Sequence, residues 1–208
     1  MLDLLQSDPL VFVLVGVAIV FALGLHEYAH ALAADLQGDR LPRAMGRLTL
    51  NPVKHLDPLG TLLILLVGFG WAKPVEFRPN ALASKRFGAA LVALAGPLMN
   101  IVLALAAAFI LIAMAKDGSI EGVIEEFLLR FAEINIVLAV FNLLPIPPLD
   151  GSRLLTIFLP PSKQRIIFFL DRYGILILLA LLFFGRESVL EPLITSVGRF
   201  IFRLAGAG

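Results

Sequence analysis

The chain has 208 residues, of which 59% are hydrophobic and only 16% are charged, so it is far more apolar than a soluble domain. The 17 Lys and Arg residues nearly balance the 16 Asp and Glu residues, which argues against nucleic acid as a partner. Cysteine is absent, so any metal ion must be bound by His, Asp or Glu. These numbers indicate a membrane protein embedded in a lipid bilayer.

Four apolar stretches predict membrane-spanning helices, because each approaches or exceeds the length that a bilayer crossing needs. The first begins at Pro9 and continues through HEYAHALAA, and the second covers residues 87–115. Two more are predicted at residues 127–144 and 166–184. Residues 189–204 are shorter and mixed, so they either cross the membrane or lie on its surface. We expect an all-α polytopic membrane protein with about four to six transmembrane helices.

The stretch DPLGTLLILLVGFGWAKPVEFRPN lies between the first two predicted spans. Its apolar part is short for a crossing and contains the helix breakers Gly68, Gly70 and Pro74. Non-helical backbone at membrane depth is tolerated only inside protein or beside a water-filled cavity. We therefore expect a re-entrant, β-hairpin-like element here. The alternative is a surface turn anchored at the membrane interface by Trp71 and Lys73.

The charges in the loops predict the orientation. Arg and Lys residues follow the first span and precede the second, whereas the loop KDGSIEGVIEE is net acidic. Because basic loops stay on the cytoplasmic side, the HEYAH end of the first span should face the cytoplasm. We expect a multi-pass protein of a prokaryotic cell membrane.

The motif HEYAH contains His26, Glu27 and His30 at the end of the first span. Residues four apart share a helix face, so both imidazoles can bind one metal ion while Glu27 lies beside them. In an HExxH zinc site the metal lowers the pKa of a water molecule, and the Glu takes its proton during attack on a carbonyl. Ionisable groups are costly inside a membrane, which favours a functional site over a chance match.

A catalytic zinc ion needs a third protein ligand. The candidates are His55, Asp57, Glu133 and Asp150, and their spacing does not choose among them. Asp150 follows a proline-rich, non-helical stretch in FNLLPIPPLDG, which would present it rigidly. It could equally well cap a helix that begins near Ser152.

Five motifs occur in the order HEYAH, NPVKHLDPLGT, GWAKPV, AGPLMN and FNLLPIPPLDG. This set resembles the site-2 protease family of intramembrane zinc metalloproteases, and the resemblance extends from the first span to Gly151. It implies a zinc metalloendopeptidase that cleaves a transmembrane protein or peptide substrate within the bilayer. The remaining segments are too short for accessory domains, so we expect one membrane-embedded domain over residues 1–208.

The resemblance also implies the roles of individual residues. His26, His30 and Asp150 would bind Zn²⁺, and Glu27 would be the general base. Asn142 would stabilise the oxyanion or hold the substrate backbone, although it could instead hydrogen-bond the helix end freed by a following proline. The GWAKPV stretch would offer an edge strand to an unwound substrate, with these substrate-binding residues: Gly70, Trp71, Lys73, Pro74 and Val75.

Other polar residues are given no catalytic role. His55 lies in one of the motifs but is as well explained by satisfying a buried loop. In AGPLMN, Gly96 permits close helix approach, and Asn100 could bond across helices or support the site, but we favour packing. No partner is predicted for Glu133 or Asn135.

Two other classes of protein remain as alternatives. A metal-binding transporter could also place His and Asp at mid-membrane, but repeated halves or several broken helices would be expected. No repeat is visible in the sequence. The second alternative is a catalytically silent membrane scaffold. The presence of Glu27 beside filled ligand positions argues against it. The sequence does not predict the substrate or the oligomeric state.

Overall fold

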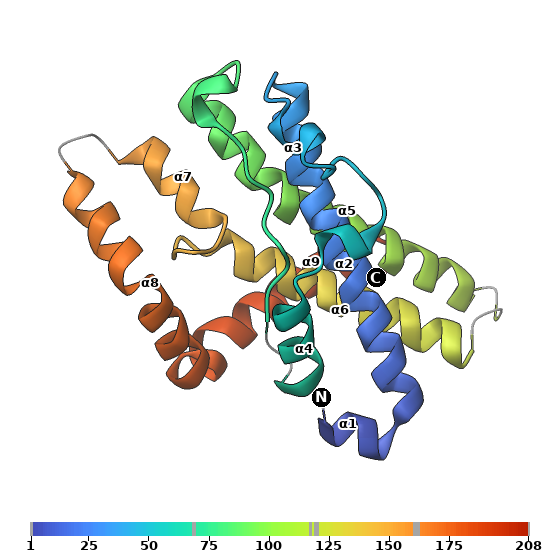
Figure 1. The fold of residues 1–208 in the computed structure, drawn as a ribbon. Coiled ribbons are helices and arrows are strands. Elements are labelled where there is room, and N and C mark those ends of the chain that lie inside the picture. Colours follow the sequence, from blue (N-terminus) through green and yellow to red (C-terminus); the bar gives the residue numbers. More distant parts are fainter. Residues whose placement is uncertain (1, 68–69, 117, 119–120, 160–162, 208) are drawn as a thin grey trace.

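The computed structural model describes residues 2–67, 70–116, 118, 121–159 and 163–207, and these residues form helices and connecting loops without a β-sheet (Figure 1). The elements in chain order are α1 (Leu2–Ser7), α2 (Pro9–Leu36), α3 (Leu41–Ala44), η1 (Pro52–His55), α4 (Pro58–Val67), η2 (Pro79–Ala81), α5 (Lys85–Lys116), α6 (Val123–Leu143), α7 (Gly151–Phe158), α8 (Gln164–Phe184), η4 (Arg186–Leu190) and α9 (Glu191–Leu204).

Helix α2 forms the first predicted span and packs against α5 and α6. It begins where Asp8 accepts a hydrogen bond from the N–H of Val11, and Pro9 suits the first helical position. Its buried face is rich in Ala and includes Gly24. Such small residues let neighbouring helices approach closely inside a membrane.

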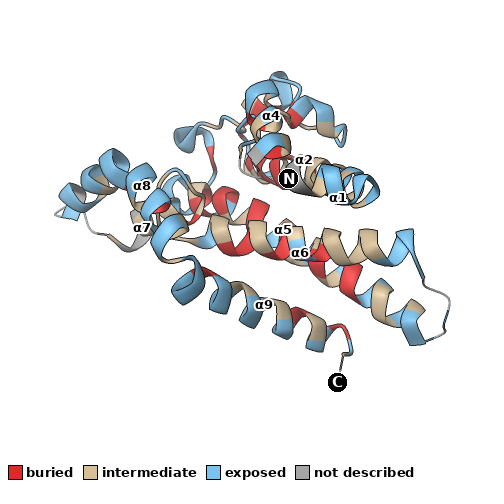
Figure 2. Cartoon of the chain, turned by 90° about the horizontal axis from the view of Figure 1, so that it is seen from below, coloured by how far each residue is buried: buried red, intermediate tan, exposed pale blue. Residues whose placement is uncertain are grey.

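Helices α5 and α6 pack against one another, and α9 covers them both. Their shared core consists of Ala104, Ala108, Ile136, Val140, Ile201 and Ala205. Figure 2 shows the buried residues concentrated where α2, α5 and α6 meet. Pro97 lies inside α5 and is buried, a position that a transmembrane helix tolerates because neighbouring groups satisfy the freed carbonyl.

Three of the described helices are long and apolar enough to cross a membrane, namely α2, α5 and residues Arg165–Phe184 of α8. This finding confirms a helical, multi-pass membrane protein. The predicted span at residues 127–144 also forms a helix, α6, but four charged residues in it keep it out of this set: Glu125, Glu126, Arg130 and Glu133. Helix α9 has only 14 residues and packs on α5 and α6.

The element between the first two spans consists of helix α4 and an extended segment, residues 70–78. The described residues contain one isolated antiparallel bridge, between Leu56 and Ala72, and no strand, and Gly68 lies outside them. Lys73 donates its N–H to the carbonyl of His55, but Pro74 has no N–H with which to continue a ladder. This is a physical reason why the described part of the predicted hairpin is no more than a bridge.

Helix α8 stands apart from the helices that form the core (Figure 1), and Figure 2 shows most of it exposed. Its buried Gly174 lies against the loop that joins α6 to α7. A Cβ at this position would lie 3.0 Å from the carbonyl carbon of Pro147. Glycine therefore allows α8 to support the loop that leads to Asp150.

Candidate metal centre

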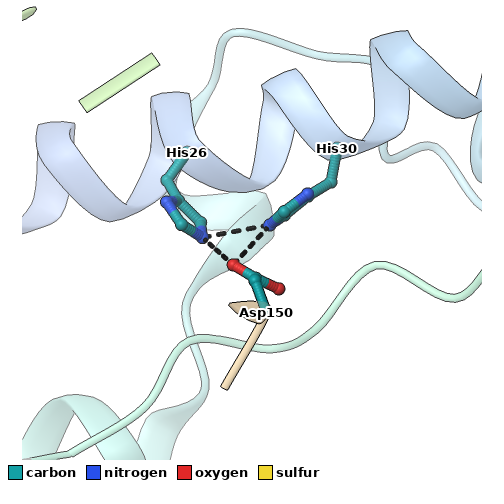
Figure 3. Close-up of side chains that lie close together, drawn as sticks. All are labelled: His26, His30 and Asp150. Carbon is teal, nitrogen blue, oxygen red and sulfur yellow. Dashed lines mark hydrogen bonds and ion pairs between the residues drawn. The ribbon is translucent and has the colours of Figure 1, made fainter. Parts of the chain in front are cut away.

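Three side chains from distant parts of the chain converge beside α5. Nε2 of His26 and Nε2 of His30 each lie 3.2 Å from Oδ2 of Asp150, and the two nitrogen atoms are 3.0 Å apart (Figure 3). A tetrahedral zinc ion with bonds of 2.0–2.1 Å separates its ligand atoms by about 3.3 Å. The cluster is therefore close to the size of a zinc site. It is the only group of three or more metal-ligating side chains among the described residues.

The local structure explains how these side chains meet. His26 and His30 are one turn apart on the buried face of α2. Asp150 occupies the N-cap position of α7, but its side chain makes no capping hydrogen bond. The capping alternative is therefore wrong for this structure. Gly151 follows because a Cβ there would overlap the carbonyl groups at the end of α6.

Hydrogen bonds on the far side of each imidazole fix its orientation. Nδ1 of His26 lies 2.6 Å from Oδ1 of Asn100, and Nδ1 of His30 lies 2.7 Å from the carbonyl oxygen of Val92. Both oxygens are acceptors, so each Nδ1 carries the proton and each Nε2 presents a lone pair to the cluster. Such outer partners are typical of metal-binding histidines.

The Asn100 amide is itself held by a second helix. Its Nδ2 donates to Oδ1 of Asn135 at 2.8 Å, and Asn135 donates to the carbonyl of Phe131 at 2.8 Å. Both asparagines are fully buried. The preference for packing at Asn100 was therefore wrong, and Asn135, for which the sequence predicted no partner, bonds to it. Polar residues inside apolar helices are a signal for function that could have identified both.

The chemistry of the cluster fits a cation. Three electron-rich atoms face one another, and Oδ2 of Asp150 is buried without a hydrogen-bond partner among the described residues. Gly96 of α5 keeps the adjoining space free, because a Cβ there would stand 2.6 Å from Nε2 of His26 and even closer to Nε2 of His30. A zinc ion would satisfy Asp150 and relieve the repulsion among the three atoms.

Glu27 lies next to the cluster on α2 and is only 9% exposed. Its Oε2 accepts a hydrogen bond of 3.1 Å from the backbone N–H of Val75. The structure thus brings the carboxylate of HEYAH into contact with the extended 70–78 segment. This contact could not be inferred from the spacing of the motifs.

The other candidates for a third ligand lie elsewhere. Oδ1 of Asp57 accepts the N–H of Gly60 and caps α4, and Glu133 pairs with Arg130. His55 is fully buried, with Nε2 2.9 Å from the carbonyl oxygen of Thr49, as expected for a residue that satisfies a loop. Of the four candidates only Asp150 joins the histidines.

Asn142 lies in the last turn of α6 and is partly buried. Its Nδ2 donates to the carbonyl of Leu138 in its own helix at 3.1 Å. None of its described hydrogen bonds reaches the metal-binding cluster. The bond to Leu138 also differs from the alternative that we considered, a bond to the helix end freed by Pro145.

Two charged residues that follow the first span, Arg47 and Asp39, hold the 70–78 segment in place. Buried Arg47 donates to the carbonyl oxygens of Lys54 at 2.7 Å and Lys73 at 3.5 Å. Asp39, which is fully buried, accepts the backbone N–H and the guanidinium of Arg78. Burial alone would raise the pKa of the Asp39 carboxyl, but the hydrogen bonds from Arg78 and Leu41 lower the pKa below its usual value. In the sequence, Arg47 and Arg78 indicated only the orientation of the loops, and their structural role was not predicted.

The remaining residues predicted to bind substrate lie along this segment. Trp71, Lys73 and Pro74 are exposed, whereas Gly70 and Val75 are partly buried. A Cβ on Gly70 would overlap the carbonyl of Gly60, so the segment passes directly over α4. The described segment is thus an extended chain with one side against protein and exposed side chains on the other.

Comparison with known proteins adds a family match. The family model described as Peptidase family M50 matches residues 14–125 and 111–183. A protein of Bacillus subtilis (strain 168) named "Putative zinc metalloprotease YwhC" is 36% identical over 197 residues, which covers 92% of this chain and 90% of that protein. No solved structure matches the chain significantly.

Other relatives, matched over shorter stretches, carry similar names. "Putative zinc metalloprotease Rip2" of Mycolicibacterium smegmatis is 33% identical over 179 residues, covering 83% of this chain and 67% of that protein. "Putative zinc metalloprotease MJ0611" of Methanocaldococcus jannaschii is 40% identical over 99 residues, covering 47% of this chain and 49% of that protein.

Proposed function

The chain belongs to peptidase family M50, the site-2 protease family, and from this premise we propose that it is an intramembrane zinc metalloendopeptidase. It hydrolyses a peptide bond within or near a transmembrane segment of a membrane-protein substrate. One observation carries the proposal: on a helix that can cross a membrane, two imidazoles and a neighbouring glutamate meet the carboxylate of Asp150 from the start of α7.

The roles of the residues follow from their atoms. His26, His30 and Asp150 hold Zn²⁺, which when bound supplies Lewis-acid activation of water and of the substrate carbonyl. Glu27 acts as the general base, taking a proton from the attacking water and passing it to the leaving amine. The hydrogen bond from Val75 occupies Oε2 of Glu27 and leaves Oε1 for the proton.

The 70–78 segment binds the substrate as an extended strand. A peptide bond in a helix is shielded by its own turn, and an unwound substrate needs partners for its freed backbone groups. The N–H groups of Lys73 and Val75 already bond to protein, so the opposite edge offers the N–H of Glu76 and neighbouring carbonyls. By the same alternation the carbonyls of Gly70 and Pro74 lie on the edge that pairs with substrate, and Trp71 contributes its exposed side chain.

Asn142 is the second polar group that we assign to the reaction. Its amide leaves the Leu138 carbonyl and donates to the developing oxyanion or to the substrate backbone. Asn142 lies at the end of α6, directly before the loop that carries Asp150, and this position supports the role.

The protein lies in a prokaryotic cell membrane with the active site toward the cytoplasm, as its basic loops favour. Helix α6 crosses as a fourth span, within the range of four to six. Its charges are compatible with crossing because Arg130 pairs with Glu126 at 2.7 Å and with Glu133 at 3.1 Å near one end of the helix.

The experiment that tests the proposal uses purified protein in nanodiscs. Zinc per chain is measured by elemental analysis, and cleavage of a tagged single-span substrate is compared for wild type and Glu27→Gln. We expect one zinc ion per chain in both proteins and a loss of cleavage of about 10²-fold or more in the variant. Equal cleavage by both proteins would contradict the role of Glu27.

The same preparation separates the two other classes of protein. A silent scaffold would bind zinc without wild-type cleavage. A metal transporter would instead move zinc into sealed vesicles. In that case Glu27→Gln would not be expected to abolish turnover while leaving zinc binding unchanged.

A further inference from the structure

Glu76 is the acidic residue of the 70–78 segment, and its side chain is exposed. Among the described residues, no hydrogen bond or ion pair involves Glu76. The nearby cation Arg78 is already paired, because its guanidinium donates to the buried carboxylate of Asp39. Glu76 therefore presents an exposed carboxylate that has no partner within the described part of the chain.

The backbone around Glu76 shows which way this residue faces. The N–H of Lys73 donates to the carbonyl of His55, and the N–H of Val75 donates to Oε2 of Glu27. Backbone groups alternate between the two edges of an extended chain, so the N–H and carbonyl of Glu76 face the opposite edge. This is the edge proposed to pair with substrate, one residue away from the contact with the general base.

Pairing at this edge would bring a substrate side chain next to Glu76. Directly opposite residues of two paired strands have their side chains on the same face, with β carbons about 4.5–5.5 Å apart in an antiparallel pair. Opposite charges at such positions attract and like charges repel. The Lys73 side chain lies three residues away and therefore on the other face of the strand. Glu76 thus favours a cation at the substrate position opposite to it.

Membrane proteins supply a cation of this kind. Lys and Arg are concentrated just outside the apolar part of a transmembrane segment on its cytoplasmic side. The proposed orientation places the metal centre toward the same side of the membrane. A basic residue at the cytoplasmic boundary of a substrate helix can therefore reach the 70–78 segment.

We propose that Glu76 is a specificity-determining residue that selects substrates with a Lys or Arg opposite it in the unwound segment. The preferred substrate is a transmembrane protein whose cleaved stretch includes the basic boundary of its helix. The inference rests on the proposed function, because it requires the 70–78 segment to pair with substrate, and it adds the chemical class of the substrate residue that is recognised.

The test measures peptide affinity in a protein that does not consume the peptide. Glu27→Gln protein in phosphatidylcholine nanodiscs is titrated with a short fluorescent peptide of Thr and Ala that carries one central Lys, and with the same peptide carrying Gln instead. The lipid has no net charge, so it does not attract the Lys peptide. We expect the Lys peptide to bind about threefold to fivefold more tightly, the effect of one favourable cross-strand pair.

Two results of this titration would overturn the proposal. Equal affinities for the two peptides would mean that the charge of Glu76 serves only to keep an exposed edge from pairing with other strands. Failure of both peptides to bind would mean that the segment does not accept a strand.

Matched variants in the same background locate the effect. Glu76→Gln should abolish the preference for Lys, and Glu76→Lys should reverse it, so that the Gln peptide binds more tightly. Each protein is judged by the ratio of its two affinities, so a general change in peptide binding cancels. Glu125→Lys is the control, because it makes the same change of charge at an exposed position of α6, outside the segment. Equal effects of Glu76→Lys and Glu125→Lys on the ratio would show a diffuse charge effect and overturn the proposal.

Failure of this inference differs from failure of the protease proposal. Cleavage by the wild type without any preference for the Lys peptide would contradict the role of Glu76 and leave the protease proposal standing. A preference for Lys that depends on Glu76, in a protein whose wild type cleaves nothing, would support the role of Glu76 and contradict the protease proposal.

Discussion

The backbone N–H of Val75 donates a hydrogen bond of 3.1 Å to Oε2 of Glu27, although the two residues are 48 positions apart. The proposed general base and the proposed substrate-binding segment are therefore in direct contact. If the 70–78 segment binds substrate as proposed, this one hydrogen bond would link substrate binding to the position of the base.

The first prediction concerns this backbone group. Val75→Pro removes the N–H that holds Glu27, so cleavage per zinc-loaded protein should fall about tenfold or more, because a displaced base is poorly aligned. Bound zinc should not change, since no proposed ligand lies in the segment. Val75→Ala, which keeps the N–H, is the control. Equal cleavage rates of the proline and alanine variants would contradict the proposed coupling between Val75 and Glu27.

Sequence alone predicted the parts of the site that are local in the chain. The spacing of His26 and His30 fixes their shared helix face, and the length of the apolar runs fixes α2, α5 and α8. The partner of His26 is different: Asn100 lies 74 positions away, and only the packing of α5 on α2 brings them together. Tertiary contacts of this kind leave no periodic pattern in a single sequence.

The expected hairpin is a second case. The short apolar run, its helix breakers and the family resemblance predicted a hairpin-like element around GWAKPV, and the described residues contain only the bridge from Leu56 to Ala72. Pro74 interrupts the ladder, and side-chain tethers from Arg47 and Asp39 take the place of strand pairing. A charged residue that anchors backbone carbonyls is hard to predict, because its sequence context is that of an ordinary cytoplasmic loop.

The second prediction tests Asp150 as a ligand. Asp150→Asn keeps the size of the side chain but supplies a poor neutral ligand, so zinc per chain and cleavage should both fall. The fold should be retained, because the carboxylate makes no capping hydrogen bond that the change could remove. Circular dichroism and elemental analysis of the same sample provide the two readouts. Wild-type zinc content in this variant would exclude Asp150 from the ligand set.

The third prediction concerns the space beside the cluster. Gly96→Ala places a Cβ 2.6 Å from Nε2 of His26, so it should displace the imidazoles and strongly reduce zinc binding. Gly16→Ala is the matched control, because the nearest atom to its Cβ is a Leu65 methyl group at 3.8 Å. The control should keep its zinc and gain slightly in helix stability, since Ala is favoured over Gly by roughly 0.5–1 kcal/mol within a helix. Zinc retention by Gly96→Ala would show that the cluster can move away from α5.

The last prediction concerns the buried amides behind His26. Asn100→Ala removes the acceptor that fixes the His26 tautomer, so zinc affinity should fall about 10- to 100-fold, the usual effect of losing such an outer partner. Asn135→Ala keeps that acceptor but removes its support, so its effect on zinc affinity should be smaller. If Asn135 acts only through Asn100, the double variant should bind zinc no more weakly than Asn100→Ala alone. Competition with a zinc-selective chelator measures all three affinities. If the two losses of zinc affinity were fully additive, Asn135 would act on the site independently of Asn100. The hydrogen bonds that run from α6 through α5 to α2 would then not be the means by which Asn135 supports His26.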